Sequence, residues 1–332
     1  NGSEQMFDAV NPDRFWYFTT DRGVLSTHSR GRYFQKNAIN KKELGLSWTT
    51  ALTGALHPSM PVILVCVGTG AAGKLLRSPD DGQTWSVVSN SDKQRWVVAF
   101  DLQHPDYCYQ WRERSADAGQ TWTEMKNMPA GAIVCGVSRS NGSIIYAMDA
   151  IGGSRKKVWR SIDRGDTWQL VIETTWDLTL PGPNDMFVFN VDPFNPNTVY
   201  TSNANGHIMK WDVSVLPARA TPVSVGGVSE PDFFINLFEI DPRHPNVMYA
   251  GNQRANTGNK FFRSVDGGVS WQNISDYIPQ GTLKTANVSP VTGEVYLSTP
   301  NGSLVMLPPY PTRNTAYEAV PYTNNHLGEA YD

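Results

Sequence analysis

The apolar residues of this chain lie in short runs separated by turn-forming residues, and one arrangement of these runs recurs. Its clearest copies, an apolar run, a turn with two prolines and a second apolar run, occupy residues 187–200 and 237–249. Weaker copies occupy residues 10–17, 57–65, 98–107, 137–146 and 288–296. Runs of β-branched and aromatic residues between Pro, Gly and Asn clusters predict strands. We find no helical period longer than two turns, so the pattern predicts an all-β fold.

A second pattern, S-x-D-x-G-x-[T/S]-W, recurs between these hairpins, and such an internal repeat outweighs other signals. Its four copies are Ser78–Trp85, Ser115–Trp122, Ser161–Trp168 and Ser264–Trp271. Ser and Asp side chains stabilise tight turns, and the glycine supplies the positive φ that such a turn needs. The tryptophan is large enough to hold the turn against neighbouring strands. We therefore interpret eight residues as structural: Asp80, Trp85, Asp117, Trp122, Asp163, Trp168, Asp266 and Trp271.

This pattern resembles the Asp-box, or BNR repeat, of sialidases, sortilin-type receptors, xyloglucan-hydrolysing glycoside hydrolases and photosystem II assembly factors. In those families the box marks the blades of a β-propeller, so the resemblance implies the same fold here. Residues 27–34 keep the box shape with Ser29 in place of Asp. Residues 206–212 are the nearest substitute for a box in the fifth unit. The Trp-Asp dipeptides at 176–177 and 211–212 lack a repeated offset, which disfavours a WD40 propeller.

The hairpin pattern occurs seven times along the chain. The 332 residues divided among seven units give about 47 residues each, enough for four short strands. We therefore predict an all-β, seven-bladed β-propeller of four-stranded antiparallel blades with Asp-box turns, over residues 1–308. Residues 309–332 lack the box and are predicted to form a closing outer strand, at residues 316–322, or a tail. Only residues 107–114 separate the proline turn from the box in unit three, which predicts a very tight hairpin there.

The composition of the chain disfavours several classes of function. Charged residues make up 18% of the chain, its net charge is −3, and it has no basic run, which disfavours nucleic-acid binding. The longest apolar run, residues 62–67, is too short to span a membrane. Cys66, Cys108 and Cys135 lie in apolar runs, and we interpret them as buried free thiols. The sequence has no zinc-ligand spacing, phosphate loop or nucleophile elbow, so we predict no metal or cofactor. Because it begins with Asn1, we interpret the chain as processed or as part of a longer protein.

Strand order predicts where a ligand binds. We name the four antiparallel strands of each blade A to D in chain order. The A–B turns, which contain the prolines, and the C–D turns, which are the boxes, then share one face, and the B–C and D–A loops share the other. The boxes occupy the first face, so we expect a site on the second, near the axis, where loops carry function. There, an exposed Trp, amides and an Arg offer the stacking area and hydrogen bonds that a sugar needs. The predicted ligand-binding residues are Trp176, Asp177, Asn203, Asn205, His207, Asn252 and Arg254. The alternative is a solvated loop, with Trp176 folded back beneath it.

Catalysis by paired carboxylates is a further hypothesis, because two carboxylates across a cleft can hydrolyse glycosides. Asp177, Asp185, Glu230 and Asp232 lie in the same loops. Asp21 lies in a turn that resembles the catalytic T-D-x-G-G turn of xyloglucan-hydrolysing enzymes, although Val24 replaces the second glycine. Those enzymes build their cleft between two propellers, and this chain has one. The candidate catalytic residues are Asp21, Asp185 and Asp232. No F/Y-R-x-P tetrapeptide occurs, which disfavours sialidase activity.

The function expected from the sequence is an extracellular or surface-displayed module that recognises carbohydrate, resembling a glycoside hydrolase with or without hydrolysis. The alternative is a protein-binding scaffold or adhesin domain of a larger receptor or viral assembly, without catalysis. The sequence leaves open the glycan or protein partner, the organism and the oligomeric state.

Overall fold

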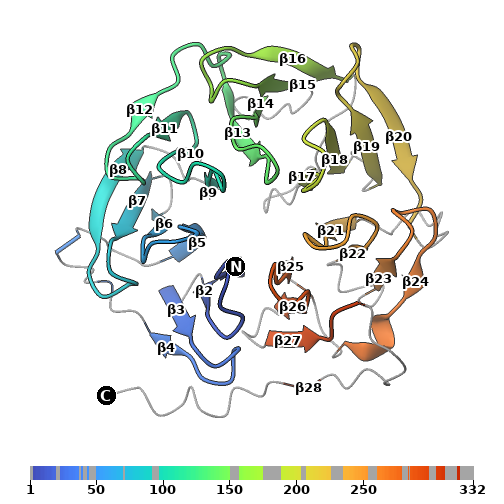
Figure 1. The fold of residues 1–332 in the computed structure, drawn as a ribbon, viewed down its shortest axis with the longest axis horizontal. Coiled ribbons are helices and arrows are strands. Elements are labelled where there is room, and N and C mark those ends of the chain that lie inside the picture. The colour runs from blue at the N-terminus through green and yellow to red at the C-terminus, as the bar shows by residue number, and fades with distance from the viewer. Residues whose placement is uncertain are drawn as a thin grey trace.

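The computed structural model is a ring of seven four-stranded antiparallel sheets around a central axis (Figure 1). It describes residues 3–19, 23–36, 39, 43–44, 50–69, 72–91, 97–149, 157–174, 188–202, 207–225, 235–252, 260–278, 283, 285–298, 304–310 and 320–321. In every blade the strands follow one another in chain order, from strand A at the axis to strand D at the rim. The predicted all-β, seven-bladed propeller is therefore confirmed. No helix in the described part of the chain is long and apolar enough to cross a membrane.

The strands are short, as their apolar runs predict. The first four blades consist of β1 Ser3–Phe7, β2 Phe15–Thr19, β3 Gly23–Thr27 and β4 Gln35–Lys36; β5 Thr50–Leu56, β6 Ile63–Thr69, β7 Ala72–Ser78 and β8 Ser86–Ser91; β9 Val98–Phe100, β10 Cys108–Gln110, β11 Glu113–Ser115 and β12 Thr123–Glu124; and β13 Ala132–Val137, β14 Ile145–Asp149, β15 Lys157–Ser161 and β16 Gln169–Glu173. The last three consist of β17 Phe189–Val191, β18 Thr198–Ser202, β19 Ile208–Asp212 and β20 Arg219–Val223; β21 Ile235–Ile240, β22 Met248–Asn252, β23 Phe261–Ser264 and β24 Gln272–Asn273; and β25 Thr285–Val288, β26 Val295–Ser298, β27 Leu304–Leu307 and β28 Val320–Pro321. A 3-10 helix, η1 Ser275–Tyr277, follows β24.

The hydrophobic core is divided into seven clusters, one between each pair of neighbouring blades. Between blades one and two, for example, Trp16 and Phe18 pack with Ile63 and Val65. A strand packed between two neighbouring blades buries both of its faces, so near-continuous apolar runs such as 62–67 are found here rather than alternating ones. The blades therefore stabilise one another, and no blade carries a core of its own.

The ring closes between blades one and seven through side chains. Phe15 lies 5.1 Å from Tyr296 between ring centroids, and Phe7 lies 5.0 Å from the same ring. Gln5 Nε2 donates to Thr285 Oγ1 at 3.3 Å, which joins the two innermost strands β1 and β25. At the rim of blade seven, β28 pairs with β27 through Val305–Pro321 and Met306–Val320. Among the described strands, each blade is built from one continuous stretch of chain.

Several local predictions can be compared with the structure. The hairpin of blade three is tight, because only Trp111 and Arg112 separate β10 from β11. Cys66, Cys108 and Cys135 are buried and free, as predicted, and burial raises the pKa of the Cys108 thiol to about 12.

Two predictions are wrong. Residues 208–212, part of the segment offered as the box of blade five, form the strand β19, and the C–D turn follows at residues 213–218. That turn uses different chemistry, since Ser214 donates from its backbone N–H and its hydroxyl to Asp212 Oδ1. Val10, placed at the start of an apolar run, lies in the A–B turn of blade one and is 75% exposed.

Candidate functional site

The seven A–B turns are built alike, and each begins with a side chain that caps the turn. In blade five, Asp192 Oδ1 accepts the backbone N–H groups of Phe194 and Asn195, at 2.9 and 3.1 Å. Asp8, Asp101 and Asp241 occupy the same position and accept turn N–H groups in the same way. Ser138, Ser289 and His57 replace the aspartate in the other blades. The proline turns of the sequence are therefore also capped turns, because Asx and Ser side chains satisfy the backbone there.

His57 shows how one of these caps is tuned. Its Nδ1 accepts the N–H groups of Ser59 and Met60, at 3.2 and 3.0 Å, so the ring proton lies on Nε2. Burial lowers the pKa of His57; Asp106 opposes this shift and Arg77 adds to it. The neutral ring is the form that can accept both bonds, so burial and turn geometry favour the same protonation state.

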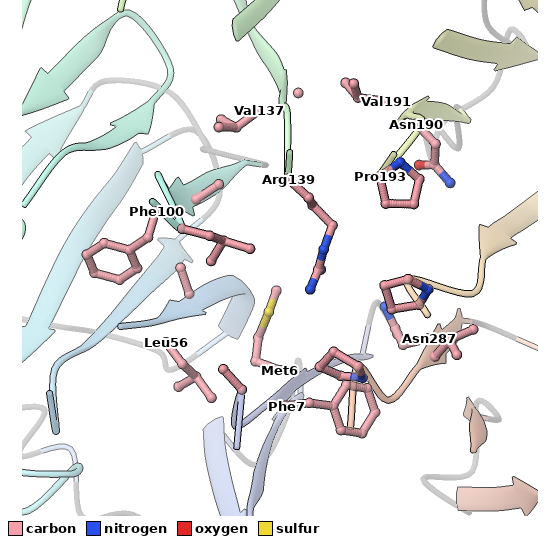
Figure 2. A pocket seen from close by; sticks show the side chains of 18 of the residues that line it. Met6, Phe7, Leu56, Phe100, Val137, Arg139, Asn190, Val191, Pro193 and Asn287 are labelled. Atoms are coloured by element: carbon pink, nitrogen blue, oxygen red, sulfur yellow. The ribbon is translucent and has the colours of Figure 1, made fainter. Parts of the chain in front are cut away.

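The turns surround an axial chamber of about 410 Å³. The chamber is lined by the ends of the seven inner strands and by the first residues of the A–B turns (Figure 2). One residue per blade forms an inner ring, consisting of Met6, Ala55, Ala99, Gly136, Asn190, Glu239 and Asn287. Three residues further along each chain segment, a second residue per blade forms a collar at the mouth, consisting of Ala9, Pro58, Leu102, Arg139, Pro193, Pro242 and Pro290. The chamber therefore opens on the face that carries the A–B turns.

Most of the polar side chains of the chamber come from one side of the ring. Asn190, Glu239 and Asn287 belong to blades five, six and seven, and Arg139 belongs to blade four. The wall from blades one to three is mainly apolar and includes Met6, Leu56 and Phe100 (Figure 2), with Gln5 of β1 as its polar member. Among the described lining residues, Arg139 is the one cation and Glu239 the one carboxylate. The chamber is therefore amphipathic, with both signs of charge on its polar side.

Arg139 is placed by contacts from the preceding blade. Gln103 Nε2 donates to the Arg139 carbonyl at 2.6 Å, and Gln103 Oε1 accepts the Gly142 N–H at 2.9 Å. A Cβ on Gly142 would lie 2.0 Å from Asp101 Cγ, so glycine is required for this close approach. Desolvation by the surrounding chamber walls lowers the pKa of the Arg139 guanidinium, although the side chain is exposed to solvent, and the negative charge of Glu239 opposes that shift. Figure 2 shows the side chain extending from the end of β13 into the middle of the chamber.

The four S-x-D-x-G-x-[T/S]-W segments are the C–D turns of blades two, three, four and six. In each, the Asp Oδ1 accepts the N–H of the Thr or Ser, at 2.8–2.9 Å, and Oδ2 accepts its hydroxyl at 2.6 Å. The first Ser accepts the glycine N–H, at 2.7–2.9 Å, and the Trp Nε1–H donates to the glycine carbonyl, at 3.0–3.1 Å. The glycines have φ between 80° and 91°. Every polar residue of the pattern is thus engaged within its own turn.

The A–B and C–D turns are joined within each of the first six blades. The residue before the box glycine has positive φ, and its N–H donates to a carbonyl of the A–B turn, as Asp81 does to Pro61 at 2.8 Å. Equivalent bonds run from Arg30 to Asp13, Ala118 to Asp106, Arg164 to Ser143 and Gly267 to Asn246, and Val213 to Asn197 in blade five. Hence the A–B and C–D turns share one face, as strand order predicted.

Most of the predicted loop site falls outside the described residues. This is the case for Asp21, Trp176, Asp177, Asp185, Asn203, Asn205, Asp232 and Arg254. His207 is exposed and directly precedes β19, and Asn252 ends β22, so both lie at the B–C side of consecutive blades five and six. The loop site and its catalytic carboxylates therefore remain predictions. Within the described ranges, no group of three or more His, Cys, Asp or Glu side chains could hold a metal ion.

The chamber residues were not identified from the sequence. Arg139 stands where the other A–B turns have Pro, Ala or Leu, and aligning the seven turns would have exposed it as the single charged member. Asn190, Glu239 and Asn287 each precede the last residue of an inner strand, as Met6 and Ala55 do. Their convergence depends on closure of the ring, which no local pattern expresses.

The sequence is similar to curated xyloglucanases. It is 24% identical over 295 residues to a xyloglucanase from Acetivibrio thermocellus, an alignment that covers 81% of this chain and 32% of that protein. The chain therefore spans less than a third of that relative's length. No protein-family model matches the sequence.

Solved structures share the fold. A GH74 enzyme from Niastella koreensis superposes with a TM-score of 0.69 at 17% identity, over 96% of this chain and 54% of that one. YCF48 from Cyanidioschyzon merolae superposes with a TM-score of 0.64 at 13% identity, over 94% of this chain and 100% of that one. This chain is thus a seven-bladed β-propeller that resembles the propellers of GH74 xyloglucanases.

Proposed function

We propose that this propeller is a glycoside hydrolase-like module that recognises a polysaccharide of the xyloglucan class. The observation that carries the proposal is the similarity to a xyloglucanase over 81% of the chain. The superposition on a GH74 enzyme over 96% of the chain agrees with it at the level of the fold. Sequence and fold therefore point to the same relatives, and a shared ligand class is the simplest functional consequence.

We place the polysaccharide site on the face that carries the B–C and D–A loops. Around the axial chamber, the opposite face is formed by A–B and C–D turns that bond to one another through their main chains. The proposed platform is Trp176, with Asp177, Asn203, Asn205, His207, Asn252 and Arg254 around it. An aromatic ring gives stacking area at low entropic cost, and the amides and Arg supply directional hydrogen bonds to hydroxyls.

Binding is tested by titrating xyloglucan oligosaccharides into the protein in a calorimeter, with mannan oligosaccharides as the control ligand. We expect Trp176→Ala to weaken xyloglucan binding at least about tenfold, as loss of a central aromatic anchor does. Tyr33→Ala is the matched control, because Tyr33 is an aromatic residue 69% exposed on the C–D turn of blade one. Equal affinity for the two glycans, or equal loss in the two variants, would refute the proposal.

Hydrolysis is a separate part of the proposal. If the chain hydrolyses xyloglucan, Asp21, Asp185 and Asp232 are the candidate carboxylates, and a retaining or inverting pair needs two of them across the cleft. Release of reducing ends from xyloglucan measures this activity. We expect Asp→Asn at an essential carboxylate to abolish release while binding persists. Binding without release by the unaltered chain identifies a recognition module.

The alternative function, a protein-binding scaffold or adhesin domain, is favoured by a different observation. The face that carries the A–B and C–D turns exposes large apolar side chains, among them Val10 at 75%, Ile162 at 63% and Val269 at 85%. Exposed apolar groups of this kind are typical of protein interaction surfaces when they form a contiguous patch. A glycan array separates the two functions, because a scaffold binds none of the glycans. Extracellular or surface display is part of both proposals, and surface labelling of intact cells tests it.

A further inference from the structure

We propose that the axial chamber binds a small hydroxylated carboxylate, of which a uronic acid is the simplest example. The chamber lies on the turn face, so this site is independent of the polysaccharide site proposed on the loop face. Four features carry the inference: one cation in the middle of the cavity, acceptor oxygens beside it, an apolar wall opposite them, and a volume suited to a small ligand.

The cation defines the charge of the ligand. Arg139 is the one cation among the described residues that line the chamber, and none of the described residues accepts a hydrogen bond from its guanidinium. A guanidinium offers a planar fork of N–H donors that matches a carboxylate. The Arg139 carbonyl accepts a hydrogen bond from Gln103, which also accepts the Gly142 N–H of the same turn, so the fork is supported rather than carried on a free loop. A carboxylate bound in the chamber would give the N–H donors of Arg139 a charged partner.

The acceptor oxygens define the rest of the ligand. Asn287 lines the same side of the chamber, but its Oδ1 is buried away from the chamber surface and has no hydrogen-bond partner. Asn190 Nδ2 donates to the Phe238 carbonyl at 2.5 Å, which leaves Asn190 Oδ1 as the acceptor of that amide. Glu239 adds a carboxylate to the same side of the chamber. The Asn190 oxygen accepts and so requires a ligand that donates, and vicinal hydroxyl groups beside a carboxylate supply such donors.

The apolar wall and the volume define the size and shape. Met6, Leu56 and Phe100 line the side of the chamber away from the two asparagines (Figure 2). A pyranose ring presents C–H groups to such a surface while its hydroxyl and carboxylate groups face the polar side. The chamber volume of about 410 Å³ lies within the range of small-molecule sites. An inorganic anion would engage Arg139 alone and leave the wall and the oxygens unused.

The binding test titrates the intact chain with three probes of similar size: sodium glucuronate, glucose and cyclohexanecarboxylate. Glucuronate carries both the carboxylate and the hydroxyls, and each other probe lacks one of the two features. We expect glucuronate to bind more tightly than either of the other probes. The difference from glucose should be at least about tenfold, because glucose lacks the carboxylate that accepts the charge-assisted hydrogen bonds of the Arg139 guanidinium. Glucose binding as tightly as glucuronate, or no heat from glucuronate at millimolar concentration, overturns the proposal.

Variants locate the binding. We expect Arg139→Gln to lower glucuronate affinity at least about tenfold and Arg139→Lys to lower it less, because Lys keeps the charge without the fork. Arg32→Gln is the matched control, since Arg32 is an exposed arginine on the C–D turn of blade one, outside the chamber lining. Equal loss in the Arg139 and Arg32 variants overturns the proposal. Thermal unfolding checks that the variants fold, and Arg139→Lys carries the test if Arg139→Gln does not.

A second variant separates hydroxyl recognition from a structural role. We expect Asn190→Ala to weaken glucuronate binding and to leave cyclohexanecarboxylate binding unchanged, because the latter has no hydroxyl to donate. Loss of both ligands in parallel, or of neither, contradicts the assigned role of Asn190. Glucuronate density in a soaked crystal outside the chamber refutes the site itself. None of these outcomes bears on xyloglucan binding at the loop face, so failure of the two proposals can be told apart.

Discussion

At the scale of single residues, the aspartates of the S-x-D-x-G-x-[T/S]-W turns act through their ionised carboxylates. Each accepts two bonds from the Thr or Ser four residues later, so the negative form is favoured in the folded state. Hydrogen bonds from Thr84 lower the pKa of Asp80, and hydrogen bonds from Ser270 lower the pKa of Asp266 to about 2. For Asp117 and Asp163, burial acts in the raising direction, but the hydrogen bonds outweigh it and the pKa is lowered.

This linkage predicts an acid-dependent stability. As pH falls, the unfolded chain takes up a proton at Asp266 near pH 4, whereas the folded chain does so near pH 2. The stabilisation is therefore complete above about pH 4 and is lost between about pH 4 and 2. We expect Asp266→Asn to lower Tm at pH 6, and the Tm gap to the unaltered protein to narrow towards pH 2.

Asp276→Asn is the control for this measurement, because Asp276 is an exposed aspartate in η1 of the same blade. A Tm gap for Asp266→Asn that stays constant from pH 6 to 2 would show that the carboxylate charge is not what stabilises the turn. The same variant also tests the structural interpretation of the boxes, since the folded protein should keep its affinity for xyloglucan.

At the scale of the elements, each box tryptophan ties its turn to the preceding blade. Trp168 of blade four is half-buried against the cluster between blades three and four, which includes Met125 and Ile145. Trp85, Trp122 and Trp271 pack in the same way against the clusters shared with blades one, two and five. One side chain thus holds its own turn, through Nε1, and docks the blade onto its neighbour.

We expect Trp168→Ala to lower the free energy of unfolding by about 2–3 kcal/mol, below the range for a fully buried aromatic residue because this ring is half-buried. Trp168→Phe keeps most of the packing and loses the bond to the Gly165 carbonyl, so it should cost about 1 kcal/mol. Urea unfolding at neutral pH measures both variants. A cost for Phe as large as for Ala would show that the hydrogen bond, and not the packing, holds the blade corner.

At the scale of the whole molecule, the seam between blades one and seven closes the ring through few side chains. The described part of this cluster has three buried residues, Phe15, Tyr296 and Leu304, with Phe7, Phe34 and Met306 packed beside them. Arg30 Nη1 also lies 3.4 Å from Glu294 Oε1 across the seam. No strand passes between the two blades in the described structure, so these side-chain contacts, together with the Gln5–Thr285 hydrogen bond, join the first and last blades here.

We expect Phe15→Ala to lower the free energy of unfolding by about 3–5 kcal/mol, because a fully buried aromatic ring is removed. Amide hydrogen exchange should rise most in β1 and β25–β27, which flank the seam. Ile145→Ala is the matched control, since Ile145 is equally buried but lies in blade four; its effect on exchange should centre on blades three and four. Uniform acceleration of exchange by Phe15→Ala would mean that the seam is no weaker than the other blade interfaces.

The sequence by itself determined the features that depend on local chemistry. Turn caps, box residues and short apolar runs act within about ten residues of one another, so they are legible in order along the chain. Each repeat forms one blade, and a blade cannot bury its faces without neighbours. Seven repeats in the sequence therefore also determined the number of blades in the ring. Where the local chemistry differed, as in the Asp212–Ser214 turn of blade five, the repeat alone placed the turn wrongly.

Only the tertiary structure decided what lies at the axis. Arg139, Asn190, Glu239 and Asn287 come from four blades, and they line one chamber because closing the ring brings the ends of the inner strands and the A–B turns that follow them around one axis. Nothing in one repeat indicates that four members are polar while their counterparts in blades one to three are apolar. The loop site around Trp176 remains a prediction, because loop conformation depends on packing between blades rather than on the repeat that positions them.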